Sequence, residues 1–129
     1  MSKTKYVDGF VLVVPKKNLA VYKKMATEAS KVWSKFGALD YKECMGDDLH
    51  IKASMGMPAP LSFAKLAKAK KGEAVWFSYI TYKSRAHRDS VNKKVMAYFT
   101  KKYGHKKDEP MPFDMKRFAY GGFKVMVGN

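Results

Sequence analysis

Cysteine, arginine and long apolar runs are scarce in this chain of 129 residues. The one cysteine, Cys44, has no partner for an internal disulfide, which excludes a disulfide-framework secreted domain and favours a cytoplasmic location. No apolar run approaches the ~18 residues that a membrane-spanning helix needs, so we expect no membrane partner. A content of 47% hydrophobic and 14% aromatic residues excludes a mainly disordered chain. We expect a single soluble domain over residues 1–129.

The net charge of +15 suggests an anionic partner, but the kind of basic residue limits that inference. Of the 26 basic residues only three are arginine, the residue better suited to bidentate contacts with phosphate and guanine. The lysines recur along the whole chain and do not form one basic arm or one recognition helix. A solvated lysine-rich surface is therefore the simpler interpretation, and we expect nucleic acid to bind only weakly and non-specifically.

Hydrophobic periodicity predicts four strands and two long helices. β-branched and aromatic runs bounded by proline or glycine favour strands, and apolar stripes at three- and four-residue steps favour helices. The expected strands cover residues 6–14, 39–45, 74–82 and 116–127, the last with a bulge or bend at glycines 121–122; the expected helices run from an N-cap at Asn18 to Gly37 and from an N-cap at Ser84 to Gly104.

Residues 49–60, with two prolines and Gly56, predict an irregular connection, and residues 61–69 predict a short helix or an extended edge. The resulting order is strand, helix, strand, irregular segment, strand, helix, strand. This order indicates an α+β protein of the ferredoxin-like βαββαβ type with an antiparallel sheet.

Both faces of the predicted sheet are apolar, although two helices cover only one of them. In the strand over 74–82, Val75 and Phe77 point to one face while Trp76 and Ile80 point to the other. A sheet with one solvated face would instead alternate apolar with polar residues. We therefore expect a homodimer in which the second face packs against the same face of another copy.

Three polar side chains on apolar strands and one arginine are candidate ligand-binding residues. Asp8 interrupts an apolar strand, where a buried carboxylate needs a partner. It is either an edge or surface-facing carboxylate, a partner in a salt bridge to Arg117 or a lysine, or a ligand-binding or proton-accepting group.

Arg88 lies in the first turns of the second helix beside Asp89, which favours the helix N-terminus or pairs with Arg85. The alternative is that Arg88 points into a cavity and holds an anionic ligand. Tyr79 and Tyr120 each place a polar tip on an apolar strand, where a pocket would use them.

Trp33, on the apolar stripe of the first helix, packs in the core or lines a cavity. Asp47, beside Asp48 and followed by His50, supplies either hard metal ligands or a general base, or else turn residues that bond their own backbone.

Metal and cofactor signatures do not appear in the sequence. His50, His87 and His105 are far apart and lack the spacing of a zinc site. Cys44 has no adjacent histidine or second cysteine, so we expect a buried thiol rather than a nucleophile. We expect neither a metal nor a cofactor.

Several segments resemble the YbaA-like family of small bacterial proteins of unknown function, over nearly the whole chain. The closing segment is the most specific of them. The matching segments are Tyr6-Val7-Asp8-Gly9-Phe10-Val11, Phe36-Gly37-Ala38-Leu39, Glu43-Cys44 before Gly46-Asp47-Asp48, Val75-Trp76-Phe77-Ser78-Tyr79, Ser84-Arg85 with Arg88-Asp89, and Met111-Pro112-Phe113-Asp114-Met115-Lys116-Arg117-Phe118-Ala119-Tyr120-Gly121-Gly122-Phe123. The resemblance implies the fold and homodimer of the dimeric α/β-barrel superfamily, which includes cofactor-free monooxygenases. It implies no activity, and residues 49–57 depart from the family pattern.

Three functions therefore stay open. The first is a small-molecule-binding protein, or a cofactor-free enzyme of the dimeric α/β-barrel type. The second is a non-catalytic assembly or regulatory module. The third is a lysine-rich surface that binds nucleic acid non-specifically.

Overall fold

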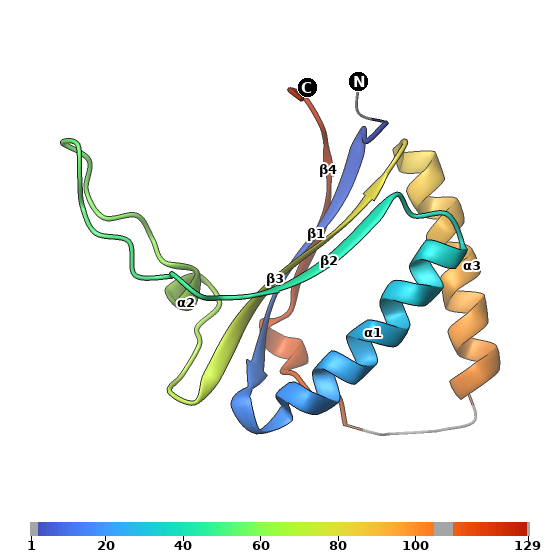
Figure 1. Cartoon of the computed structure of the whole chain (residues 1–129), viewed down its shortest axis with the longest axis horizontal. Coiled ribbons are helices and arrows are strands. Elements are labelled where there is room, and N and C mark those ends of the chain that lie inside the picture. Colours follow the sequence, from blue (N-terminus) through green and yellow to red (C-terminus); the bar gives the residue numbers. More distant parts are fainter. Residues whose placement is uncertain (1–2, 105–109, 129) are drawn as a thin grey trace.

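An antiparallel four-stranded sheet carries two long helices on one face (Figure 1) in the computed structural model, which describes residues 3–104 and 110–128. In chain order the elements are β1 (Tyr6–Pro15), η1 (Lys16–Asn18), α1 (Leu19–Lys35), β2 (Asp40–Met45), α2 (Phe63–Leu66), β3 (Glu73–Tyr82), α3 (Arg85–Tyr103), η2 (Met115–Arg117) and β4 (Ala119–Lys124). The expected combination of helices with an antiparallel sheet is confirmed.

The strand order across the sheet is β2-β3-β1-β4. The two central strands, β1 and β3, pair along their full length, from Tyr6 opposite Tyr82 to Pro15 opposite Glu73. Because these strands are central, each pairs with a neighbouring strand on both sides. Both strands are rich in apolar residues. β2 and β4 are the shorter edge strands, and each continues into irregular chain.

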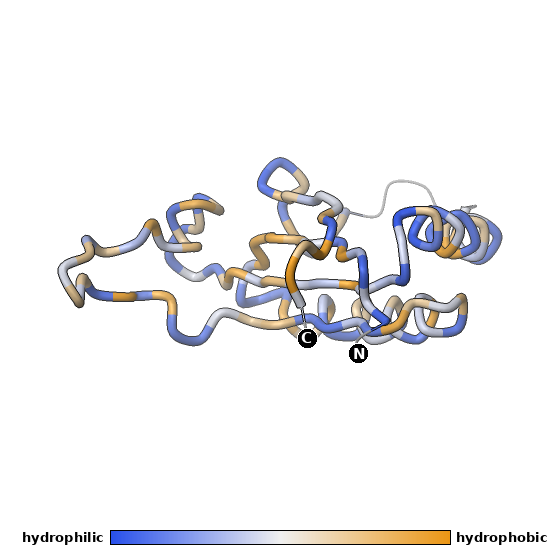
Figure 2. Tube along the Cα trace, turned by 90° about the horizontal axis from the view of Figure 1, so that it is seen from above, coloured by the Kyte–Doolittle hydropathy of each residue, from blue (hydrophilic) through white to orange (hydrophobic). Residues whose placement is uncertain are grey.

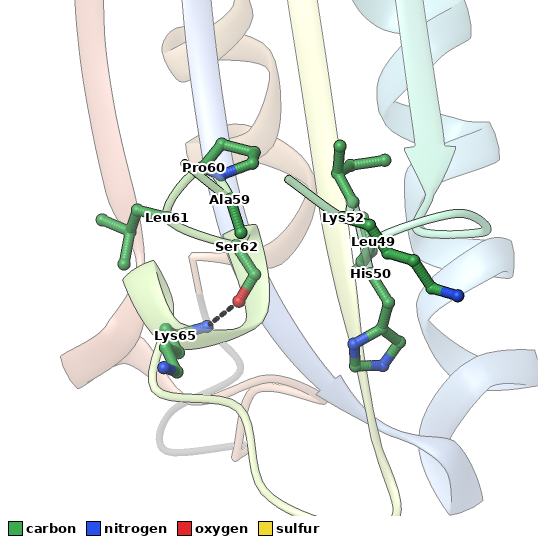
Figure 3. Close-up of a pocket in the computed structure, with 9 residues that line it drawn as sticks. Leu49, His50, Lys52, Ala59, Pro60, Leu61, Ser62 and Lys65 are labelled. Carbon is green, nitrogen blue, oxygen red and sulfur yellow. Dashed lines mark hydrogen bonds between the residues drawn. The ribbon is translucent and has the colours of Figure 1, made fainter. Parts of the chain in front are cut away.

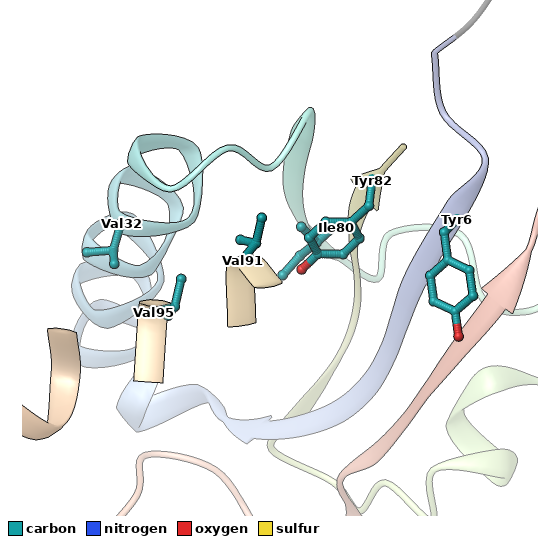
Figure 4. Packing of buried hydrophobic residues seen from close by; sticks show 6 residues of the cluster. All are labelled: Tyr6, Val32, Ile80, Tyr82, Val91 and Val95. Atoms are coloured by element: carbon teal, nitrogen blue, oxygen red, sulfur yellow. The ribbon is translucent and has the colours of Figure 1, made fainter. Parts of the chain in front are cut away.

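The main core lies between the sheet and the long helices. Figure 4 shows Val32 of α1 and Val91 and Val95 of α3 near Ile80 and Tyr82 of β3. These residues are buried because alternate strand positions point toward the helices, and helix positions four apart share one face. The apolar stripes seen in the sequence therefore meet in this layer.

Helix ends follow the sequence with one exception. The Ser84 hydroxyl accepts from the backbone N–H of His87 at 3.0 Å, which caps α3 as expected. Gly37 follows the end of α1 with a φ of +110°, a conformation that glycine adopts without strain. The expected cap at Asn18 is wrong, because its side chain makes no capping bond and donates instead to the carbonyl of Pro112 at 3.2 Å.

The other sheet face is covered at one end only. Val13 and Val75 are buried there beneath Ala67, which follows α2, and Leu49 packs against the same cluster. The short-helix alternative for residues 61–69 is thus the right one. Farther along this face, Phe77 of β3 is 45% exposed.

Residues 50–61 form a projection that we call the arm. Figures 1 and 2 show it extending from the sheet on the side opposite α1 and α3. Every residue of the arm is exposed. Near its tip, the backbones of Ser54 and Met57 pair in an isolated bridge.

Two expectations about individual residues are wrong. Glycines 121–122 make no bulge, because Gly9 pairs with Gly121 and Asp8 with Gly122 in an unbroken register. Cys44 is exposed rather than buried, because it lies on the edge strand β2.

Candidate functional site

Asp8 is the charged residue at the middle of the candidate site. It lies on the helix-facing side of β1 and is only 1% exposed. Its neighbours across the sheet, Ile80 and Gly122, bring no charge to it. A carboxylate in this position needs donors from other elements, because burial without hydrogen bonds is costly.

Arg88 of α3 supplies the main donor. Its Nη1 lies 2.7 Å from Oδ1 of Asp8, and its side chain is 13% exposed. The Ser84 cap fixes where α3 begins, so Arg88 falls one turn into the helix, over the sheet. The guanidinium also donates from Nε to Asp89 at 2.7 Å, on the exposed side.

Two tyrosines complete the contacts of the ion pair. The Tyr120 hydroxyl, from β4, donates to Oδ2 of Asp8 at 3.2 Å and accepts from Nη1 of Arg88 at 2.9 Å. Its ring stacks on Phe10 with centroids 4.8 Å apart. Tyr6 places its ring 5.1 Å from the guanidinium carbon of Arg88, which allows a cation–π contact. The residue Tyr120 is 49% exposed and forms the outer edge of the cluster.

Asn92 links this cluster to a deeper hydrogen-bond network. It lies one turn after Arg88 on α3, and its side-chain amide lowers the pKa of Asp8. Its Oδ1 accepts from Nε1 of Trp33 at 3.0 Å and from the Tyr82 hydroxyl at 3.2 Å. These bonds join α1 and β3 to α3 one turn beyond the Asp8–Arg88 pair.

The site makes Asp8 a better proton acceptor than a free aspartate. Burial raises the pKa of Asp8, and the opposing effects of Arg88, Tyr120 and Asn92 do not cancel that rise. Burial and the neighbouring Asp8 carboxylate also raise the pKa of Tyr120, so its hydroxyl stays protonated and donates. The cluster thus combines a carboxylate that accepts protons readily with a fixed positive charge.

Three of the residues singled out from the sequence, Asp8, Arg88 and Tyr120, lie together. Trp33 joins them through Asn92. The alternative of a salt bridge from Asp8 to Arg117 is wrong, because Arg117 binds the carboxylate of Glu73 at 2.7 and 2.8 Å.

Tyr6 and Asn92 were not anticipated, although the sequence carried a signal for each. Tyr6 is two positions before Asp8 on the same strand face, and Asn92 is four positions after Arg88 on the same helix face.

The other predicted residues lie elsewhere. Tyr79 is on the opposite face of the sheet, facing the same way as Phe77, because it pairs with Gly9 rather than with a helix-facing residue. Asp47 follows β2 and is exposed. His50 begins the arm and, with Lys52 and Lys65, borders a hollow of about 400 Å³ between the two limbs of that segment (Figure 3).

Glu43 is a second carboxylate on the helix-facing side of the sheet. Its hydrogen-bond donors among the described residues are hydroxyl groups rather than cations. Glu43 of β2 accepts from the hydroxyls of Tyr22 at 2.7 Å, Tyr41 at 2.6 Å and Ser78 at 2.5 Å. Burial together with the Glu43 charge raises the pKa of both tyrosines, so both remain donors. This cluster fastens α1 to β2 and β3.

No metal-binding group emerges within residues 3–104 and 110–128, where no three His, Cys, Asp or Glu side chains are placed to hold an ion. His105 lies outside the described residues. None of the helices in those same ranges is long and apolar enough to cross a membrane.

The fold and the cluster define an α+β protein with an antiparallel sheet and a buried Asp–Arg pair beneath its helices. The chain belongs to the family described as "Protein of unknown function (DUF1428)", which matches residues 5–115. It is 39% identical over 124 residues to the uncharacterized protein YbaA of Escherichia coli strain K12 and, equally, to that of Shigella flexneri, covering 95% of this chain and 97% of each relative. The resemblance to YbaA-like proteins is thereby confirmed.

A solved chain from Burkholderia cenocepacia aligns at 8% identity with a TM-score of 0.29. The alignment covers 95% of this chain but only 27% of that one. This likeness carries no argument about fold or activity.

Arg88→Met is expected to lower the free energy of unfolding by about 3–5 kcal/mol at pH 7, because it leaves the Asp8 carboxylate buried without its charge partner. The matched control is Arg85→Met, which removes an exposed arginine from the same helix. Urea unfolding at fixed protein concentration measures both changes.

The difference in free energy of unfolding between Arg88→Met and Arg85→Met should become smaller as the pH is lowered. In Arg88→Met the pKa of Asp8 rises further, because the carboxylate has lost its cation. Asp8 then binds its proton more tightly in the folded than in the unfolded chain. The free energy of unfolding of this variant therefore increases as the pH falls through the folded pKa of Asp8. A deficit that is equal at pH 7 and at acid pH would contradict this assignment.

Gly122→Ala is expected to destabilise the protein by about 1–3 kcal/mol, through overpacking of a filled site. A Cβ at Gly122 would overlap the Tyr6 hydroxyl and lie 2.8 Å from its ring, so the tyrosine side chain would have to move. Gly121→Ala is the control, because there the nearest atom is 3.8 Å away on Phe123. Thermal unfolding of the two variants compares them directly, and equal losses would show that the space beside Tyr6 is not required.

Proposed function

We propose that the Asp8–Arg88–Tyr120 cluster binds a small aromatic carboxylate and that Asp8 accepts a proton from the bound molecule. The observation that carries the proposal is the convergence of three elements on one buried carboxylate. That carboxylate has a raised pKa and is paired with a guanidinium beside a half-exposed phenol. Such combinations are enriched at functional sites.

Tyr120 provides the route by which a ligand reaches the ion pair. Its ring stacks on Phe10 on the exposed side, and its hydroxyl hydrogen-bonds to both Nη1 of Arg88 and Oδ2 of Asp8. A ligand that displaces this hydroxyl gains a guanidinium donor, a carboxylate acceptor and the face of Phe10. Arginine suits a carboxylate because its planar fork donates two parallel hydrogen bonds.

The proposed reaction is a proton transfer. The proton leaves an O–H or C–H bond of the ligand for Oδ2 of Asp8, and the bonding electron pair stays on the ligand. The resulting negative charge lies next to the Arg88 guanidinium, which stabilises it. Such a step requires no electron donor or acceptor.

The proposed assembly is a cytoplasmic homodimer with a ferredoxin-like fold, closed as a dimeric α/β barrel. The uncovered part of the second sheet face supports it: Phe77 of β3 and Phe123 of β4 are 45% and 63% exposed. From β1 and β4 no charged side chain points to this face. Asp40 and Lys42 of the edge strand β2 also point to this face, where they pair with each other. The apolar part formed by β3, β1 and β4 is suited to pack against another sheet.

We expect benzoate to shift the backbone resonances of Asp8, Arg88 and Tyr120 in a saturable NMR titration of the full chain. Arg88→Lys should weaken this binding at least about tenfold, because an ammonium cannot replace the bidentate fork. Arg85→Lys, on the exposed side of the same helix, should leave it unchanged. Shifts confined to other residues, or binding unaffected by Arg88→Lys, would reject the proposed site.

A second candidate function, weak binding of nucleic acid, is supported by the charge of the helical layer. α1 and α3 together carry ten basic and two acidic residues. A groove of about 540 Å³ between them is bordered by Lys24, Lys31 and Lys102. Glu28, the acidic residue in this groove, is already bound by Lys102 and Tyr103.

Affinity for a single-stranded oligonucleotide should accordingly fall steeply with salt. Replacing Lys24 and Lys31 by Gln should reduce the slope of log affinity against log salt by roughly 1.4, about 0.7 for each lost phosphate contact. Lys65→Gln with Lys71→Gln, outside the helical layer, is the control with the same change in charge. Fluorescence anisotropy from 20 to 200 mM salt (a range of roughly one decade) measures the slopes. Equal slopes in both double variants would exclude this groove.

A further inference from the structure

The arm, residues 50–61, leaves apolar side chains in water that its own chain does not cover. Met55 at its tip is 97% exposed, Met57 68%, Leu61 67% and Ile51 52%. The arm contains one charged residue, Lys52, in a chain with 29% charged residues. Contiguous exposed apolar side chains of this kind mark interaction surfaces.

A second exposed apolar group lies on β4 and the segment that follows it. Phe123 of β4 is 63% exposed, Met126 83% and Val127 93%. The arm begins after β2, and the strand order β2-β3-β1-β4 places β2 and β4 at opposite edges of the sheet. The two groups are thus separated at the sheet by three strand spacings, roughly 14 Å.

Two copies stacked through their uncovered sheet faces bring these groups together. A two-fold axis parallel to the strands places the β2 edge of one copy over the β4 edge of the other and preserves position along the strands. The arm follows β2 at the Met45 end of the sheet, whereas Phe123 lies at the end where β1 begins. Figure 1 shows the arm turning back upward on the uncovered side. The returning arm is thereby directed along the partner's β4 edge toward residues 123–127.

Charge also favours a second copy as the occupant at this surface. The helical layer carries a net charge of +8 from ten basic and two acidic residues, so two helical layers repel each other. The arm and residues 119–127 together contain only Lys52 and Lys124 as charged residues. Association through these segments brings the fewest like charges together.

We propose that the arm of each copy packs against β4 and residues 123–127 of a second copy, so that the two arms are exchanged across the dimer. This inference rests on the homodimer of the proposed function. It adds to that homodimer a contact outside the sheet faces, and it assigns the arm a partner.

Cysteine cross-linking tests the contact. In a Cys44→Ser background, Met55→Cys combined with Val127→Cys should give a covalent dimer of twice 14.7 kDa with a short bismaleimide reagent. Met55→Cys combined with Ala97→Cys, an exposed position on α3, should not. Met55→Cys alone controls for contact between the two arms, and an intrachain product would run as a monomer.

Sedimentation equilibrium supplies a second measurement. Met55→Asp with Met57→Asp should raise the dissociation constant of the dimer at least about tenfold, because the buried carboxylates would lose their solvation. Met96→Asp with Met115→Asp makes the same chemical change at two exposed methionines outside the arm and should have a smaller effect.

The outcomes separate this inference from the homodimer. A dimer that forms equally well in both double variants and gives no Met55–Val127 cross-link overturns arm exchange and leaves the homodimer standing. A parent protein that is monomeric at the highest concentration measured overturns both.

Discussion

The rest of the structure is arranged around the ion pair between Asp8 and Arg88. A carboxylate that is 1% exposed on the helix-facing side of a central strand cannot be left without donors. Its main donor comes from α3, so the pair fixes that helix over β1. Tyr120 extends the contact to β4, and Gly122 leaves the space that the Tyr6 ring occupies. One buried charge thus sets the positions of three elements.

The same side of the sheet holds a second carboxylate in a different way. Glu43 accepts three hydroxyl donors, whereas Asp8 is paired with a guanidinium. Hydroxyls of tyrosine and serine satisfy a carboxylate without neutralising it. The hydroxyl cluster joins neighbouring elements of the scaffold, while the ion pair ends in the half-exposed Tyr120 at the surface. This difference in access is why the Asp8 cluster, rather than the Glu43 cluster, is the candidate site.

Charge is distributed unevenly between the two sides of the molecule. The helices α1 and α3 carry ten of the 26 basic residues, whereas the arm and β4 carry one lysine each. A strongly basic protein resists self-association in general, because like charges repel. The arm and β4, with one lysine each, are largely free of that repulsion. The high net charge is therefore compatible with a specific homodimer that forms through the arm and β4.

Local patterns in the sequence determined the elements: Ser84 caps α3, Gly37 follows α1, and the alternation along β1 placed Asp8 among buried neighbours. The sequence identified Asp8, Arg88 and Tyr120 as candidate site residues, but it did not predict that Asp8 pairs with Arg88. From the sequence, Arg117 and Arg88 are equally good salt-bridge partners for Asp8. The strand order and the position at which α3 begins decide between them. Tertiary structure also decided that Cys44 is exposed, that Asn18 bonds Pro112, and that the arm projects away from the sheet. Periodicity reports which face a residue takes within its own element, whereas contacts between elements depend on how those elements pack.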